Sequence, residues 1–352
     1  MESNASYLHK NELFILSTLT IAILAILVIL LVYLMIRKSH DIRKRNKIEN
    51  YKEKYNPLIF QLVTEGFSSS ELRPVTDLQQ KAVEELLSRY IKVIEGEEER
   101  SRLSELAAMY LTENYRKRLR SKIWSTRMNT LYHNDDFNMI SLLNDVNRLL
   151  KYKRLSHKEL VHILRILALF QYKPLFHLLT SHYQYLAEID YRHILIRLQK
   201  QQFHQFVQYF HLADSSLQKA VLEVIAIKRE TYYLPFIENI IFSYSGEIKL
   251  RALRALAEIG SVENINPYIG PLHSSKWEER MLAAKLIGSV KEEKAMPRLI
   301  ELLHDQTWWV RSQAGQSICQ FGNGKDILRT VLETSKDTFA KDMAWEWLHK
   351  GV

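Results

Sequence analysis

The chain has few of the residues that interrupt helices or cross-link a fold. Its 352 residues include 10 glycines, 7 prolines and one cysteine, while 47% of them are hydrophobic. Because turns and loops draw heavily on glycine and proline, this composition predicts an all-α protein. The single cysteine, Cys319, excludes an internal disulfide and any zinc site built from several cysteines, and it is expected to be a small buried residue on a helix.

The chain also lacks the short motifs that mark common catalytic and cofactor sites. It contains no HExxH, no GxGxxG and no GxxxxGK followed by Ser or Thr, and the GNG at 322–324 is expected to be a turn. Eight of the 13 histidines lie within 133–211, but His157 and His162 are five residues apart, a spacing that does not place two metal ligands on one helix face. We therefore expect no metal, no cofactor and no enzymatic activity.

Positive charge is concentrated in two segments of a chain whose formal net charge is +9. Segment 37–54 has eight basic and three acidic residues, and segment 114–134 has six basic residues and no acidic one. The rest of the chain is close to neutral. A nucleic-acid partner is not expected, because proteins that grip nucleic acid carry positive charge over the contact surface.

The N-terminal region contains an uncharged apolar run of 24 residues, Leu13 to Ile36. At about 1.5 Å per residue, a helix of this length crosses a hydrocarbon core of roughly 30 Å. A cleaved signal peptide has a shorter apolar core of roughly 7–15 residues, with its basic residues in front. Here only Lys10 precedes the run, so we predict a single transmembrane helix.

Basic residues that follow the run closely set its orientation. They are Arg37, Lys38, Arg43, Lys44, Arg45 and Lys47. By the positive-inside rule, the short N-terminus lies outside the cell membrane and everything after the span lies in the cytoplasm. The same residues are candidate contacts for anionic membrane lipids. The alternative is a stop-transfer flank without a recognition role.

The cytoplasmic part is expected to begin with a short helix and a linker. The helix that leaves the membrane is predicted to end at Asn56-Pro57, and the linker reaches residue 75. Thr76 is a candidate N-cap for a helix to about Val93, since its hydroxyl accepts a hydrogen bond from a free backbone N–H group.

Two further helices are expected over about 97–109 and 111–131. The second carries a basic patch formed by Arg116, Lys117, Arg118, Arg120, Lys122 and Arg127. This patch is a candidate contact for the membrane or for an acidic protein partner, and the alternative is an ordinary solvated helix face. Asp135 and Asp136 follow the patch and are interpreted as helix caps.

A pattern with a period of 31 residues begins near residue 217. In each copy, residues at positions zero, four and eight lie on one face of a helix. The four copies are Leu217, Val221 and Ile225; Ile248, Ala252 and Leu256; Glu279, Ala283 and Ile287; and Val310, Ala314 and Ile318. The small residue at position four lets a neighbouring helix approach closely, so we expect these helices to stack.

A second helix is expected in each unit of the pattern. Pro235, Pro267 and Pro297 stand eighteen or nineteen residues after position zero, where a proline suits a first helical turn. The segment 336–349 is interpreted as the first half of a further unit that closes the array. The phase of any repeats before residue 217 stays open.

The turn that ends the first helix differs between copies. Gly260 and Gly322 stand twelve residues after position zero, whereas Arg229 and Lys291 replace glycine in the other two copies. Glycine favours the left-handed conformation that ends many helices. The turn geometry at Arg229 and Lys291 therefore stays open.

The residues of this pattern resemble a known family. VRSQAGQSICQFG at 310–322, preceded by DQTWW from Asp305, is similar to HEAT repeats of the short bacterial kind, whose first residues run D-x-x-x-x-V-R. The segments IKLRALRALAEIG (248–260) and ERMLAAKLIGSV (279–290) share the likeness. The resemblance implies an α-solenoid of antiparallel helix pairs, and HEAT arrays are typically scaffolds that hold proteins.

Tryptophans recur with the same period. Trp277 and Trp308 are 31 residues apart, and Trp309 follows directly. They form a candidate ridge for a protein partner, because Trp is enriched at interface hot spots. The alternative is packing between repeats. Trp345 and Trp347 point to opposite sides of the last helix, so at least one of them is expected to be exposed.

These patterns predict six segments and a leading function. The segments are an extracytoplasmic N-terminus (1–12), a transmembrane helix (13–36), a basic juxtamembrane helix and linker (37–75), an N-terminal helical region (76–132), diverged helical repeats (133–216) and HEAT-like repeats with a C-terminal capping helix (217–352). The leading hypothesis is a single-pass membrane scaffold whose cytoplasmic α-solenoid docks a protein partner, such as a membrane enzyme or assembly. The alternative is an enzyme, or an accessory subunit of one, that acts on a lipid-linked or polymeric substrate with its site at 114–136.

Overall fold

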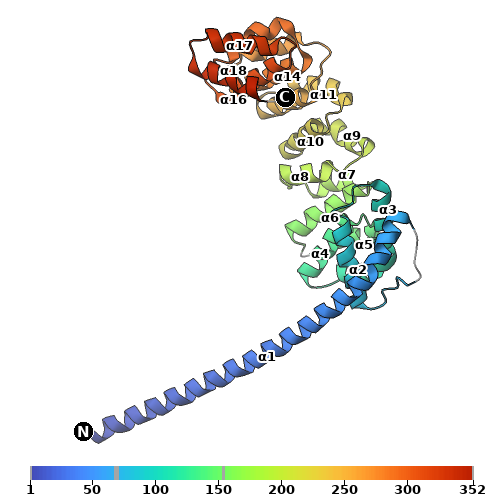
Figure 1. Ribbon diagram of the computed structural model, residues 1–352, viewed down its shortest axis with the longest axis vertical. Helices are drawn as coiled ribbons and strands as arrows, with labels where there is room; N and C mark the ends of the chain where they lie inside the picture. Colours follow the sequence, from blue (N-terminus) through green and yellow to red (C-terminus); the bar gives the residue numbers. More distant parts are fainter. Residues whose placement is uncertain (1, 67–70, 153–154, 351–352) are drawn as a thin grey trace. The chain divides into compact units, whose positions relative to one another are not determined.

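The computed structural model describes residues 2–66, 71–152 and 155–350, with side chains from residue 16 onward. The described residues form helices and turns without a strand, so the predicted all-α fold is confirmed (Figure 1). The chain divides into two compact units, residues 1–166 and residues 167–352.

The first unit contains six helices and one short 3-10 helix among its described residues. These are α1 (Glu2–Glu65), α2 (Asp77–Tyr90), α3 (Glu97–Leu119), α4 (Trp124–Asp136), η1 (Ile140–Leu142), α5 (Leu143–Leu149) and α6 (His157–Leu169). The boundary between the units falls inside α6.

Helix α1 is a single helix of 64 residues that projects from the other helices of its unit (Figure 1). From Leu16 to Lys47 its side chains are exposed. After that point Ile48, Tyr55 and Val63 are buried on one stripe, and α1 packs against α2 and α3. By length and composition, α1 is the one described helix that is long and apolar enough to cross a membrane.

The prediction that this helix ends at Asn56-Pro57 is wrong, because Pro57 lies inside α1. Buried Tyr55 and Ile59 hold the helix against its neighbours on both sides of the proline. The Asn56 side chain also accepts a hydrogen bond of 2.9 Å from the Tyr90 hydroxyl on α2. Tertiary packing thus overrides the local tendency of proline to end a helix.

The predicted N-cap at Thr76 is confirmed. The Thr76 hydroxyl accepts a hydrogen bond from the Gln79 backbone N–H at 3.3 Å, and the Gln79 side chain accepts one from the Thr76 backbone N–H at 2.9 Å. The two expected helices at 97–109 and 111–131 are corrected to α3, which runs without a break to Leu119, and α4, which starts at Trp124. The turn comes at Ser121, whose hydroxyl accepts a hydrogen bond from the backbone N–H of Ile123.

The second unit is a series of short helices. They are α7 (Leu175–His177), η2 (Leu178–His182), α8 (Glu188–Leu195), α9 (Lys200–Gln208), η3 (Phe210–Leu212), α10 (Ser215–Lys228), η4 (Thr231–Tyr233), α11 (Leu234–Ser243), α12 (Gly246–Ile259), α13 (Asn266–Ile269), η5 (Gly270–His273), α14 (Trp277–Val290), η6 (Glu293–Ala295), α15 (Met296–Leu302), α16 (Trp308–Cys319), α17 (Gly324–Thr334) and α18 (Thr338–His349).

Helices α10, α12, α14, α16 and α18 form one stacked layer of this unit, in which each helix packs against the next. The first four start 31 residues apart, so the predicted period is confirmed. Ala252, Ala283 and Ala314 at position four are 0% exposed, as predicted for close helix packing. The second helices of these units are α11, α13 and α15. As predicted, each has its proline in the first turn: Pro235, Pro267 and Pro297.

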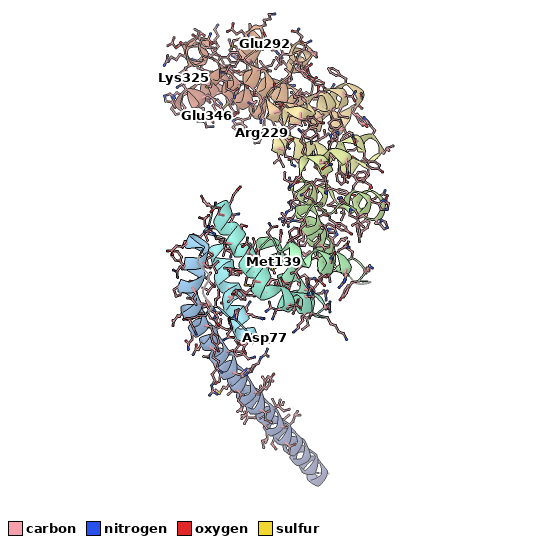
Figure 2. The ribbon with its side chains drawn as sticks, turned by 90° about the vertical axis from the view of Figure 1, so that its right-hand side faces the viewer. Asp77, Met139, Arg229, Glu292, Lys325 and Glu346 are labelled. Carbon is pink, nitrogen blue, oxygen red and sulfur yellow. The ribbon has the colours of Figure 1, made fainter. Side chains whose placement is uncertain are left out.

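The turn after the first-layer helix keeps its geometry without glycine. Arg229 and Lys291 have φ angles of 53° and 56°, close to the 69° of Gly260 (Arg229 is labelled in Figure 2). A left-handed residue with a side chain costs roughly 1–2 kcal/mol, which the packing of the array offsets. Gly322 is not in the left-handed region, and the last turn has another form.

Candidate functional site

The basic patch predicted between residues 116 and 127 is divided by the structure into paired and free cations. Arg116 forms an ion pair with Asp145 at 3.0 Å, and Arg118 forms one with the buried Glu84 at 2.6 Å. Lys117 and Lys122 are exposed and form no ion pair with a described carboxylate. Arg120 is largely exposed and lies 3.8 Å from Asp145.

Arg127 lies in the packed interior, whereas the sequence placed it on the exposed patch. It is 7% exposed, and its guanidinium contacts one carboxylate oxygen of Glu159 at 2.7 and 2.8 Å. The same group donates hydrogen bonds to the backbone carbonyls of Ser121 and Lys122. Arg127 therefore ties the α3–α4 turn to helix α6.

Two arginines of the second unit make the same contacts. Arg280 and Arg311, like Arg127, are the fourth residues of their helices and donate to the backbone carbonyls five and six residues earlier. Arg280 also binds both carboxylate oxygens of Asp305, at 2.7 and 2.8 Å. Burial alone would raise the pKa of Asp305, but these hydrogen bonds hold that pKa below its ordinary value.

Because Arg127 on α4 makes the same backbone contacts as the repeat arginines, the repeat pattern extends to residues before 217, where the sequence left its phase open. The signal is a Trp-x-x-Arg motif at the start of each helix: Trp124 with Arg127 on α4, Trp277 with Arg280 on α14, and Trp308 with Arg311 on α16. Helix α4 is therefore built like a first-layer helix of the array.

The tryptophans of the predicted ridge differ in exposure. Trp277 is half-buried and packs against the core of its unit, while Trp308 and Trp309 are 44% and 58% exposed. The two exposed rings meet edge to face, with centroids 4.8 Å apart. Phe339 on α18 is also exposed, and the Arg311 guanidinium lies 4.8 Å from its ring centroid. The exposed aromatic cluster consists of Trp308 and Trp309.

Three further sequence predictions concern the C-terminal helices α16 to α18. Trp345 is exposed and Trp347 is half-buried, which confirms that at least one of them faces solvent. Cys319 is half-buried rather than fully buried, and burial raises the pKa of its thiol. Gly322 and Asn323 form the predicted turn before α17.

A charged hollow on helices α8, α10 and α12 was not predicted. Glu223, which is 8% exposed, lies 3.3 Å from both Arg251 and Arg254. Arg251 also pairs with Glu188, and Arg192 completes the lining. A signal for it existed in the sequence, because Glu223 and Arg254 occupy the same position of the 31-residue period on α10 and α12. Three arginines face two glutamates in this hollow, and their ion pairs link α8, α10 and α12.

Asp135 lies in the last turn of α4 and faces two side chains of α6. It lies 3.7 Å from the His162 ring and 3.8 Å from the Arg165 guanidinium. The C-cap residue of α4 is Phe137, and the next element, η1, has Met139 at its N-cap position without a side-chain cap hydrogen bond, so neither aspartate caps it. Within the part of the chain that the structure describes, no group of three or more His, Cys, Asp or Glu side chains is arranged to hold a metal ion.

The six basic residues after the apolar run are all exposed on α1. Arg45 is the one that also contacts the rest of the unit. It lies 2.6 Å from Glu49 on α1 and 2.8 Å from Glu85 on α2. Lys52, which is 7% exposed, lies 3.2 Å from the same Glu85. These pairs fix the basic end of α1 to α2.

Comparison with known proteins supports the helical repeat. The HEAT repeat family model matches residues 295–324. The matched residues cover α15 and α16, so the family unit is shifted by one helix from the pairing suggested by the sequence pattern.

Two solved structures similar to the chain are crystal structures of engineered proteins from the Northeast Structural Genomics Consortium. One is 14% identical, covers 88% of this chain and 95% of its own, and has a TM-score of 0.34. The other is 15% identical, covers 67% and 94%, and has a TM-score of 0.21. A comparison with curated proteins finds no significant match. From the family match and the stacked helices, the chain is a helical repeat protein, and its residues 295–324 are similar to a HEAT repeat.

Proposed function

We propose that this protein is a membrane-anchored scaffold that presents its helical repeat array to a protein partner at the cytoplasmic face of the membrane. In this proposal residues 13–36 cross the membrane, and the segments from residue 37 onward lie in the cytoplasm. HEAT repeats generally mediate protein–protein interaction, which supports the scaffold role. The uncharged apolar run and the exposed cations after it support the anchor.

The observation that carries the scaffold role is the exposed aromatic cluster. Trp308 and Trp309 stand on a helix whose opposite face is fully packed, since Val310 and Ala314 are 0% exposed. Two large rings on a rigid support lose little conformational entropy when a partner covers them. Tryptophan is also among the residues that most often dominate the free energy of protein association.

The test is recovery of partners with a matched surface variant. Full-length protein and its Trp308→Ala/Trp309→Ala variant are purified from membranes in mild detergent, and co-purifying proteins are quantified by mass spectrometry. The control is Phe242→Ala, which removes another aromatic ring that is 67% exposed. We expect the double variant to lose its specific partner by roughly 30-fold or more, as for a hot spot of about 2 kcal/mol. No co-purifying protein on the wild type would contradict the scaffold role, and the same partners on all three proteins would contradict the role of the exposed aromatic cluster.

The orientation has its own test. A reporter fused after the C-terminus is expected to show cytoplasmic behaviour. A signal from outside the membrane would overturn the orientation, and a chain that separates from membranes on flotation would overturn the anchor. The enzyme alternative has weaker support, because Asp135 at its suggested site pairs with His162 and Arg165.

A further inference from the structure

The turn between α3 and α4 forms an exposed surface that is both apolar and basic. We name it the α3–α4 turn surface, and it consists of Arg120, Lys122, Ile123, Trp124, Lys151 and Tyr152. Ile123, Trp124 and Tyr152 are 63%, 45% and 42% exposed. All three side chains are therefore open to solvent among the described residues of the first unit.

The surface is held in place from beneath. The Trp124 indole N–H donates a hydrogen bond of 2.9 Å to the Ser156 hydroxyl, which joins the turn to the start of α6. The buried Arg127 binds the backbone carbonyl of Lys122, and its guanidinium lies 5.9 Å from the Tyr152 ring centroid. The turn and the segment around Tyr152 therefore form one preorganised patch.

The cations of this patch are available for a ligand. Lys122 and Lys151 are exposed, and neither forms an ion pair with a described carboxylate. The Arg120 side chain is 64% exposed, and its nearest carboxylate, Asp145, also accepts from Arg116. An anionic surface is the natural complement of such a patch.

Ion pairs on α2 place the patch relative to the apolar run of α1. Arg45 on α1 and Arg118 on α3 contact the adjacent residues Glu85 and Glu84 of α2, so they lie at a similar level. At the other end, Arg102 of α3 donates to the carbonyl of Val63 near the end of α1. Helix α3 therefore runs back along α1, and its last turn points toward the apolar run.

Figure 2 agrees with this direction. It shows Asp77, the first residue of α2, on the side of the first unit from which α1 projects. Helix α2 runs parallel to α1, because Glu85 lies beside Arg45 and Tyr90 lies beside Asn56. The side of the unit that contains the α3–α4 turn is thus the side of the apolar run.

The distance to the apolar run is short. Nine residues separate Ile36, the end of the run, from Arg45, which corresponds to about 14 Å of helix. The headgroup layer on this side of the hydrocarbon core occupies about 5–7 Å of the distance from Ile36 to Arg45. The remaining distance between the headgroups and the level of Arg45 is comparable to a Debye length of about 8 Å, and a modest tilt of α1 closes it.

We propose that the α3–α4 turn surface is a second membrane contact, which inserts Ile123 and Trp124 among anionic lipid headgroups and fixes the first unit against the bilayer. The inference rests on the proposed membrane anchor. The free lysines supply attraction to anionic lipid, and the apolar side chains supply burial. An acidic protein partner would need no such alignment of the patch with the apolar run.

The experiment places a fluorescent reporter on this patch in the full-length chain. In a Cys319→Ala background, Ile123→Cys is labelled with a polarity-sensitive fluorophore. The matched control is Val93→Cys, a 75% exposed apolar residue in the α2–α3 loop, at the opposite end of α2 from Asp77. Both proteins are reconstituted into vesicles of phosphatidylcholine with or without phosphatidylserine, and flotation checks that they remain bound. Lipids with a nitroxide on the acyl chain near the headgroup serve as quenchers.

We expect the label at position 123, but not the one at position 93, to be quenched by the nitroxide lipids in vesicles that contain phosphatidylserine. Replacing Lys122 by Glu is expected to weaken the contact by at least about fivefold, in line with the attraction of one cation to an anionic surface. Failure of the chain to float with the vesicles would overturn the membrane anchor itself. Flotation with an unquenched label at position 123 would leave the anchor standing and overturn the second contact.

Discussion

Replacement of Arg127 by alanine should destabilise the first unit strongly, although the sequence places this residue in a surface patch. The Arg127 and Glu159 side chains are 9% and 1% exposed. Removing one partner of a buried ion pair leaves the other charge without compensation, which typically costs about 3–5 kcal/mol. Glu159 keeps its hydrogen bonds with the Ser156 hydroxyl and backbone N–H. We therefore expect a loss near the lower limit, about 3 kcal/mol.

Hydrogen exchange measured by mass spectrometry on the full-length chain resolves this effect by region. A loss of about 3 kcal/mol accelerates exchange through local opening by roughly 100-fold in peptides from α4 and α6. Peptides from α14 and α16 serve as an internal reference. Lys122→Ala, an exposed cation of the same segment, should change the free energy of opening by no more than about 0.5 kcal/mol.

A double variant separates the ion pair from the packing. Arg127→Met combined with Glu159→Leu removes both charges and keeps the volume, so it should recover most of the lost protection. If Arg127→Ala accelerates exchange no more than Lys122→Ala does, Arg127 is a surface residue and the structural role assigned to it fails.

Three further predictions concern the turns, the helix packing and the pH dependence of stability. Lys291→Gly should raise the free energy of unfolding by about 1 kcal/mol, because the backbone of the exposed Lys291 is in the left-handed conformation, which glycine adopts without strain. Denaturant unfolding that shows no gain in this free energy would refute the prediction. Gly288→Ala should lower it by about 1–2 kcal/mol, since the added methyl group would lie 2.8 Å from the Ser317 backbone; unchanged exchange in α14 and α16 would contradict the close approach. Burial lowers the pKa of His133 below 6.5, so the unfolded chain binds a proton before the folded one, and the first unit should lose stability as the pH falls below about 6.5. Exchange in α4 measured between pH 7.5 and 5.5 tests this, and His133→Phe should remove the dependence.

The stacked repeats of the second unit were predictable because their signal is periodic. Apolar and small residues recur every 31 positions, and packing requires them at the places where the structure buries them. The apolar run of α1 was equally clear. The local order of residues is enough to recognise these features, and no contact between distant residues is needed.

The role of Arg127 could not be read in the same way. A basic residue among five others on a short segment indicates a charged surface, and only its partner Glu159, on another helix, reveals the buried pair. The continuity of α1 through Pro57 was missed for a similar reason, because buried contacts of Tyr55 and Ile59 decide it. Long-range contacts override local propensity in both cases.

The Trp-x-x-Arg motif changes which residue of the exposed aromatic cluster should matter most to a partner. Trp124, Trp277 and Trp308 all occupy the first position of their helices, so a tryptophan recurs at that position, although α10 and α12 begin with Ser215 and Gly246. The next position is Ser125 on α4 and Glu278 on α14, whereas on α16 it is Trp309, 58% exposed. A large exposed ring at a position that α4 and α14 fill with polar residues departs from the repeat, and such departures from a structural pattern are expected at functional sites. Trp309→Ala should therefore release the partner more than Trp308→Ala does, while Trp308→Ala should cost more stability. Equal partner loss from the two single variants in quantitative co-purification would place the binding role on the repeat position instead.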